Sequence, residues 1–143
     1  MLKILLATDS EMLRYRLMTL IEEIPDTEII CSVSNVKQVL NEVKSLKPDV
    51  AIISFPKFGQ SNARLAPTLG NLKPSVPVIA LTTTSNYVDE WRRAGASYVF
   101  DLAFQLKEFC ACLVNLSRAN QDYNNHLSKN NLSRNELQNE ESK

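Results

Sequence analysis

The sequence predicts an α/β domain in which a parallel sheet is covered by helices on both faces. Short runs rich in Ile, Val and Leu alternate along the chain with stretches of helical period. Each run is continuously apolar, which is typical of strands buried on both sides. Apolar residues make up 44% of the 143 residues, enough for the core of one domain. The repeated strand–helix pattern favours a doubly wound sandwich with right-handed crossovers.

Strands and helices are predicted in strict alternation. The expected strands are Lys3–Ala7, Glu28–Val33, Asp49–Ser54, Val76–Thr82 and Tyr98–Phe100. The first helix follows Asp9 and Ser10 as candidate N-caps and stops at Pro25. A second helix is predicted to begin at Ser34 and to end before Pro48.

The second half of the chain predicts three further helices. Residues 85–94 form a shorter candidate, ended by Gly95 in the helix-stop position. A long one begins at Leu106. In residues 61–72, Pro67 and Gly70 interrupt the helical spacing, so we expect a short or distorted helix there.

Composition predicts one domain, residues 1–120, and a polar, flexible tail, residues 121–143, because Asn, Ser, Glu and Lys dominate the tail. Sixteen basic and 16 acidic residues balance, which gives no global attraction to nucleic acid. No secretion signal or membrane-length apolar run is found, and the three cysteines make an odd count, so we expect a cytoplasmic protein with reduced, partly buried thiols.

Candidate site residues lie where the strands end, because ligands of open α/β sheets bind at that edge. These are Thr8, Asp9, Ser54, Thr82, Asp101 and Leu102. Two of the six are carboxylates. No Lys, Arg or His is expected to reach this edge.

Four phrases at the predicted strand ends and turns resemble the receiver domain of two-component response regulators, the CheY-like fold, with the first half closest to the NarL type. They are Ile4–Asp9 with Arg14 in the following helix, Lys47–Ile53, Pro77–Thr82 and Arg93–Ala96. The resemblance covers residues 1 to about 118. It implies a flavodoxin-like five-stranded sheet of order 2-1-3-4-5.

The family's activity implies an aspartate that accepts a phosphoryl group, with Mg²⁺ held by it and by two acidic neighbours. Charge neutralisation by the metal and a lysine is what drives such a transfer. In this chain the acidic pair becomes Thr8-Asp9, and the phosphoacceptor position is Ser54. Asp9 is equally interpretable as a helix N-cap. Ser54 is interpreted as a satisfied polar group, with phosphorylation by an outside kinase as the alternative.

The remaining positions of the family's pocket are also altered. The hydroxyl position is kept as Thr82, whereas the lysine position falls on Leu102, or on Asp101 if one gap is allowed. Neither side chain neutralises phosphate. We therefore expect no enzymatic activity, no metal and no cofactor.

In receivers, partners and dimer mates bind the face built from the fourth helix, the fifth strand and the fifth helix. The corresponding residues here are Tyr87, Trp91, Arg92, Tyr98, Phe100 and Phe104. Trp, Tyr and Arg are enriched in binding hot spots. Tyr87 and Trp91 share one helix face, so packing into the core is the competing interpretation.

The function expected from the resemblance and from these replacements is a pseudo-receiver that binds a protein partner or itself, without phosphorylation, nucleic acid or membrane. Two alternatives stay open. One is a truncated or orphan transcriptional regulator of NarL type, although the polar tail has no apolar period for a helix-turn-helix domain. The other is a flavodoxin-like binder of a small ligand, although Thr8–Glu11 has no glycine to cradle phosphate.

Overall fold

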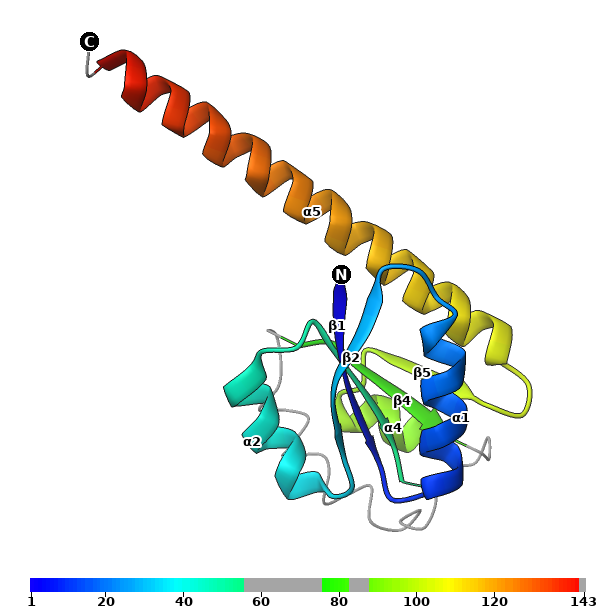
Figure 1. Ribbon diagram of the computed structural model, residues 1–143. Coiled ribbons are helices and arrows are strands. Elements are labelled where there is room, and N and C mark those ends of the chain that lie inside the picture. Colours follow the sequence, from blue (N-terminus) through cyan, green and yellow to red (C-terminus); the bar gives the residue numbers. More distant parts are fainter. Residues whose placement is uncertain (56–75, 83–87, 142–143) are drawn as a thin grey trace.

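The computed structural model describes residues 1–55, 76–82 and 88–141. Within them, five parallel strands form one sheet in the order β2-β1-β3-β4-β5, as the resemblance implied (Figure 1). The strands are β1 Leu2–Thr8, β2 Thr27–Val33, β3 Val50–Ser54, β4 Val78–Thr82 and β5 Tyr98–Asp101. Each predicted strand is confirmed, with ends shifted by one or two residues.

The helices described are α1 Glu11–Glu22, α2 Val36–Leu46, α4 Val88–Ala94 and α5 Leu106–Glu141. Ser10 caps α1, because its Oγ accepts a hydrogen bond from the Leu13 N–H at 3.2 Å. Asn35, one residue beyond the expected Ser34, caps α2. The helix predicted over residues 61–72 lies outside the described residues. No helix in the described part of the chain is both long and apolar enough to cross a membrane.

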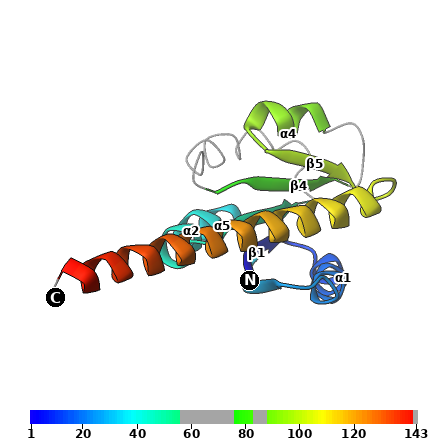
Figure 2. The ribbon, with the colours of Figure 1, turned by 90° about the horizontal axis from the view of Figure 1, so that it is seen from above.

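Two hydrophobic cores lie on opposite faces of the sheet, because successive side chains of a strand point to opposite sides. Leu5 and Ala7 of β1 pack in the core that α2 and α4 cover. Ile4 and Leu6 pack in the core that α1 and α5 cover. Figure 2 shows α4 and α1 on opposite sides of the sheet. Both faces are buried, which explains why the strands read as continuous apolar runs.

Two helices end at residues in the left-handed region of backbone space. Gly95 follows α4 with φ 108°, and Lys47 follows α2 with φ 49°. The Lys47 N–H closes the last turn by donating to the Val43 carbonyl at 3.0 Å. Only glycine adopts this region without a steric cost from Cβ. Gly95 therefore serves as the predicted helix stop, whereas Lys47 is mildly strained.

We expect opposite effects from substitutions at these two helix ends. Gly95→Ala should lower the free energy of unfolding by about 1 kcal/mol, because a Cβ is disfavoured at positive φ. Lys47→Gly should raise it by up to about 1 kcal/mol for the same reason. Urea denaturation of both variants measures the difference. A shift of the same sign in both would contradict the described backbone.

Helix α5 runs for 36 residues, Leu106–Glu141, which corresponds to about 54 Å. Its first half packs Phe109 and Leu113 against the sheet, and its second half projects beyond the body (Figure 1). The structure assigns helix to residues 121–141, which belong to the segment expected to be a flexible tail. The chain contains no Gly or Pro after Gly95, so nothing interrupts a helix that is already nucleated on the core.

A set of hydrogen bonds, here called the exit clasp, holds α5 where it leaves the body. The Ser117 Oγ donates to the carbonyls of Asp26, at 3.1 Å, and Pro25, at 3.4 Å. The Asp26 carbonyl also accepts the Leu2 N–H at 2.7 Å. The Asn120 Nδ2 donates to the Met1 carbonyl at 3.3 Å. The clasp thus joins α5 to the α1–β2 turn and to the start of β1.

The three cysteines are unpaired and half-buried, as predicted. Burial raises the pKa of the thiols of Cys31, Cys110 and Cys112, and a nearby Glu42 carboxylate adds to the effect at Cys31. These thiols are therefore poor nucleophiles, and packing accounts for them.

Candidate functional site

The predicted strand-end residues come together at the carboxyl edge of the sheet. Thr8 of β1 is opposite Ser54 of β3 in the register, and Thr82 of β4 is opposite Asp101 of β5. All four are buried, with Ser54 only 1% exposed. The sheet therefore gathers three hydroxyls and one carboxylate at its edge, where Asp9 follows β1.

Two of these side chains accept hydrogen bonds from nearby backbone N–H groups. The Thr8 Oγ1 accepts the Ser10 N–H at 3.2 Å. The Asp101 Oδ1 accepts the Ala103 N–H at 2.9 Å, while the Asp101 N–H donates to Gln105 Oε1 at 2.9 Å. These bonds shape the turns that follow β1 and β5. Thr8 and Asp101 thus have clear structural roles.

Two buried oxygens at this edge have no hydrogen-bond partner in the described structure. They are the Ser54 Oγ and the Asp9 Oδ1. Ser10, and not Asp9, caps α1, so the N-cap interpretation of Asp9 is wrong. Among the described residues, no three His, Cys, Asp or Glu side chains converge as metal ligands would.

Of the two candidate positions for the family's lysine, Leu102 is apolar and Asp101 is a carboxylate. Leu102 is half-buried and packs against the core under α1 and α5. Its N–H donates to the Thr82 carbonyl at 2.8 Å, which continues the β4–β5 pairing by one residue. Leu102 therefore closes the edge of the sheet and places no cation there.

Arg14 of α1 corrects the expectation that no cation reaches the strand ends. One of its terminal nitrogens donates to the carbonyls of Thr8, at 2.6 Å, and Val33, at 3.3 Å, and to Ser34 Oγ at 2.8 Å. The other donates to Ser32 Oγ. The Nε lies 3.5 Å from a Glu11 carboxylate oxygen, and the Arg14 side chain is only 13% exposed. Arg14 thus joins the ends of β1 and β2 to α1.

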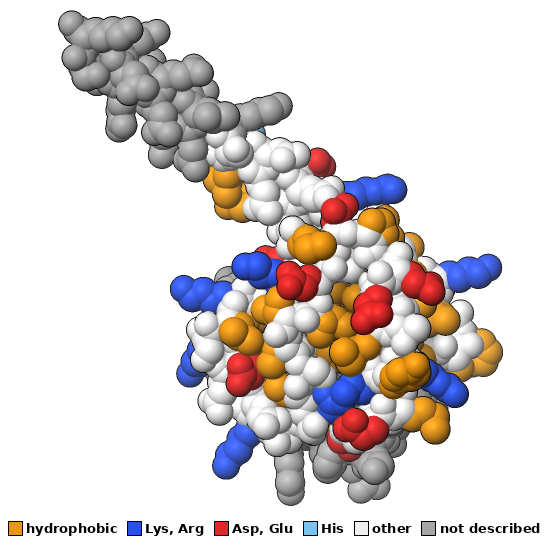
Figure 3. All heavy atoms as spheres, in the orientation of Figure 1, with side chains coloured by type: hydrophobic (Ala, Val, Ile, Leu, Met, Phe, Trp, Pro, Cys, Tyr) orange, Lys and Arg blue, Asp and Glu red, His pale blue; other side chains and the backbone are white. Residues whose placement is uncertain are grey.

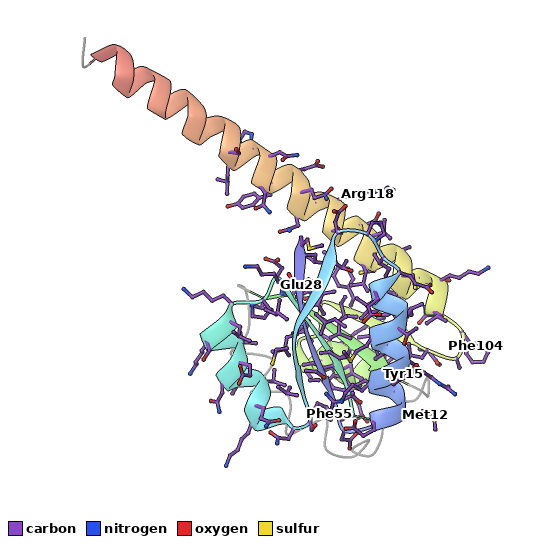
Figure 4. All side chains as sticks on the ribbon, in the orientation of Figure 1. Met12, Tyr15, Glu28, Phe55, Phe104 and Arg118 are labelled. Atoms are coloured by element: carbon purple, nitrogen blue, oxygen red, sulfur yellow. The ribbon has the colours of Figure 1, made fainter. Side chains whose placement is uncertain are left out.

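The predicted partner-binding residues separate into buried and exposed ones. Trp91 is 3% exposed and belongs to the core under α2 and α4, so its prediction as a surface contact is wrong. Arg92 is exposed, and Phe104, in the β5–α5 turn, is 84% exposed and points away from the body (Figure 4). Tyr87 lies outside the described residues. The competing interpretation, that Trp91 packs into the core, is therefore confirmed.

Tyr98 and Phe100 line an open groove between β5 and α5. Their rings stack at a centroid distance of 6.5 Å, with an interplanar angle of 4°. Across the groove, α5 contributes Ala111, Cys112, Leu116 and Ala119, and the volume is about 520 Å³. Tyr98 remains 40% exposed. Two of the predicted contact residues, Tyr98 and Phe100, thus lie on one surface.

Comparison with known proteins gives a match in structure and none in sequence. No protein-family model matches the chain, and no curated protein matches it. A DNA-binding response regulator of the LuxR family from Staphylococcus aureus superposes with a TM-score of 0.67 at 17% identity, over 82% of this chain and 99% of that one.

Two further solved structures are similar. The response regulator domain of Thermotoga maritima CheB superposes with a TM-score of 0.58 at 18% identity, over 82% of this chain and 94% of that one. The isolated receiver domain of RcsB from Salmonella enterica superposes with a TM-score of 0.59 at 15% identity, over 69% of this chain and 75% of that one.

The chain has the fold of a response-regulator receiver domain. At these identities the similarity is one of fold. The receiver fold agrees with the strand order that the sequence resemblance implied.

Sequence analysis missed two features of this receiver fold. Arg14 was recognised as part of a family phrase, yet the reach of its side chain across two strand ends is not visible in a linear pattern. The α5 side of the groove was also missed. Its signal was present, because Cys112, Leu116 and Ala119 recur at helical spacing and the pattern continues past residue 120.

Proposed function

We propose that this chain is a pseudo-receiver, a receiver-like module that acts in signal transduction by binding protein without accepting a phosphoryl group. The observation that carries this proposal is the state of Ser54. It lies at the end of β3, is 1% exposed, and its Oγ has no hydrogen-bond partner in the described structure. A serine hydroxyl is a weak nucleophile unless a neighbouring base activates it.

The surroundings of Ser54 support the loss of phosphoryl chemistry. Its register neighbour is the neutral Thr8, and the two candidate positions for a lysine hold Leu102 and Asp101. The nitrogens of Arg14 face strand-end carbonyls, hydroxyls and Glu11. A transferred phosphoryl group needs its charge neutralised by metal or cationic side chains. One carboxylate, Asp9, offers a divalent cation few ligands.

Exposed apolar surface supports protein binding. Phe104 is 84% exposed, and Tyr98 and Phe100 line a groove of about 520 Å³. Exposed aromatic side chains beside a hollow are typical of protein interfaces. The surface is composed of β5, the following turn and α5.

Incubation with acetyl phosphate and Mg²⁺, followed by intact-mass spectrometry, tests the proposal. We expect no gain of a phosphoryl mass, because the expected acceptor position holds Ser54 and the two candidate positions for the lysine hold Leu102 and Asp101. A receiver known to autophosphorylate, treated in parallel, is the positive control. A mass gain on this chain that hydroxylamine removes would reveal an aspartyl phosphate and refute the proposal.

A further inference from the structure

Charge is distributed unevenly along this neutral chain. Residues 1–36 carry three basic and six acidic side chains, whereas residues 37–88 carry six basic and two acidic ones. Within the second stretch, residues 50–88 contain no Asp or Glu. A protein without net charge still presents a local field of one sign where its charges are segregated. Helix α2 occupies the start of the positive stretch and lies on the surface of the domain (Figure 1).

One side of α2 carries exposed lysines and is here called the α2 lysine face. It consists of Lys37, Lys44 and Lys47, all of which are exposed. Lys37 and Lys44 are seven residues apart, so they lie nearly on one line along the helix, about 10 Å from each other. Lys47 directly follows the last helical residue. Figure 3 shows Lys and Arg side chains extending from the side of the molecule where α2 lies.

The carboxylates nearest to these lysines are directed elsewhere. Glu42 lies about 160° around the helix from Lys44. Burial and then the charge of Glu42 raise the pKa of the Cys31 thiol, which places this carboxylate on the β2 side of α2. The Asp49 Oδ2 accepts the Lys3 N–H at 2.8 Å. The three lysines of the face form no ion pair with a described residue, so their charge is not neutralised there.

The size and composition of the α2 lysine face fit a short acidic peptide segment. From Lys37 to Lys47 the face is about 15 Å long, which about five residues of extended chain would span. Asn41 and Ser45, both exposed on the same helix, add hydrogen-bond donors for carboxylates. Residues 36–47 include no aromatic side chain. Charge-assisted hydrogen bonds, and not the burial of apolar surface, would therefore hold an occupant of this face.

A nucleic acid fits the same face less well. A duplex carries one charge per about 1.7 Å and continues beyond a face that is about 15 Å long. Exposed carboxylates follow in the chain segment that leads into β2, where they would repel such a polyanion. They are Glu22, Glu23, Asp26 and Glu28. Three neutralised phosphates also give only weak binding at physiological salt. A carboxylate-bearing segment that ends within the face is therefore favoured.

We propose that the α2 lysine face binds a short acidic segment of a protein partner, whose carboxylates pair with Lys37, Lys44 and Lys47. This goes beyond the proposed function, because α2 and α5 cover opposite faces of the sheet and α2 thus provides a second interaction surface. Salt screens contacts between exposed charges. Such contacts determine the orientation and the rate of association more than its affinity.

Fluorescence anisotropy with a labelled octaglutamate peptide at low ionic strength tests the proposal on the full chain. One variant replaces the lysines of the face, as Lys37→Gln, Lys44→Gln and Lys47→Gln. We expect its Kd to rise about eightfold, because three exposed ion pairs contribute a factor of about two each. The matched control removes the same charge elsewhere on the exposed surface, as Arg16→Gln, Lys107→Gln and Arg118→Gln. Its Kd should change by less than about twofold. No binding, or equal effects of both variants, would overturn the proposal.

Further measurements distinguish the acidic segment from other occupants. Arginine at the same three positions keeps the charge and should leave Kd within about twofold, whereas a loss of binding would contradict the charge pairing. An eight-nucleotide oligothymidine should bind more weakly than the peptide. Tighter binding that the glutamine variant abolishes would identify a nucleic-acid site instead.

Sedimentation velocity tests a second copy of this chain as the occupant. The chain and its glutamine variant should sediment in the same state. Self-association that the variant abolishes would identify a second copy on the α2 lysine face and reject the acidic partner. None of these outcomes affects the reaction with acetyl phosphate, so this inference can fail while the proposed function stands.

Discussion

Ser54→Asp is expected to lower the free energy of unfolding at pH 7 by about 3 kcal/mol or more. The substitution restores the acidic residue type of a phosphoacceptor, but at a site that is 1% exposed. Leu102 is apolar, and Asp9 and Asp101 lie at the same edge of the sheet. A carboxylate buried there would lose its hydration, which is costly unless an opposite charge pairs with it.

The destabilisation by Ser54→Asp should depend on pH. Desolvation by burial raises the pKa of the new carboxyl above about 3.9, its value in the unfolded chain. Between the two pKa values the folded state binds more protons, so stability falls as pH rises. Guanidinium denaturation should therefore show a small loss near pH 4 and a large one at pH 7.

A neutral variant of similar shape separates charge from size at this site. Ser54→Asn should be clearly more stable than Ser54→Asp at pH 7, and the two should converge at low pH. Mg²⁺ should not raise the melting temperature of Ser54→Asp. Equal stabilities at pH 7 would mean that the site tolerates a negative charge. A marked stabilisation by Mg²⁺ would mean that the edge still binds a divalent ion. Either result would contradict the proposed function.

Arg14→Ala should lower the free energy of unfolding by about 2–3 kcal/mol, because hydrogen bonds from a charged donor to partly buried acceptors are lost together. The Thr8 carbonyl, 2.6 Å from the guanidinium, and the Val33 carbonyl would lose this partner at the ends of β1 and β2. Thermal and urea unfolding measure the loss.

Two other substitutions define what Arg14 contributes. Arg14→Lys keeps the charge but not the fork of donors, so it should recover less than half of the loss. Arg16→Ala removes an exposed arginine from the same helix and should change stability by less than about 0.5 kcal/mol. If Arg14→Ala were no worse than Arg16→Ala, the strand-end contacts would have no measurable role.

The sheet could be predicted from the sequence because burial on both faces leaves a continuous apolar run, such as Val50–Ser54. Helix ends were less predictable. Asp9 and Ser10 are equally good capping residues, and only the backbone shows that the helix starts at Glu11. The helix end at Gly95 was predictable, because glycine has no Cβ and adopts a positive φ without a steric cost.

The positions and burial of individual side chains were harder to predict from the sequence. Trp91 belongs to a residue type that serves both cores and interfaces, and its burial depends on packing from β4 and β5. Arg14 has a side chain long enough to reach acceptors from β1 and β2, which are far apart in the sequence. Residues 121–141 combine a polar composition, which is typical of a flexible tail, with an absence of Gly and Pro, which permits the helix that the structure assigns there.

The exit clasp makes α5 a lever whose pivot lies near Ser117. The 24 residues from there to Glu141 correspond to about 36 Å of helix, so a tilt of about 5° at the pivot displaces the tip by about 3 Å. The pivot is held by carbonyls of Pro25, Asp26 and Met1, in segments that border β1 and β2. A small rearrangement of the α1–β2 turn would therefore be amplified at the far end of the helix.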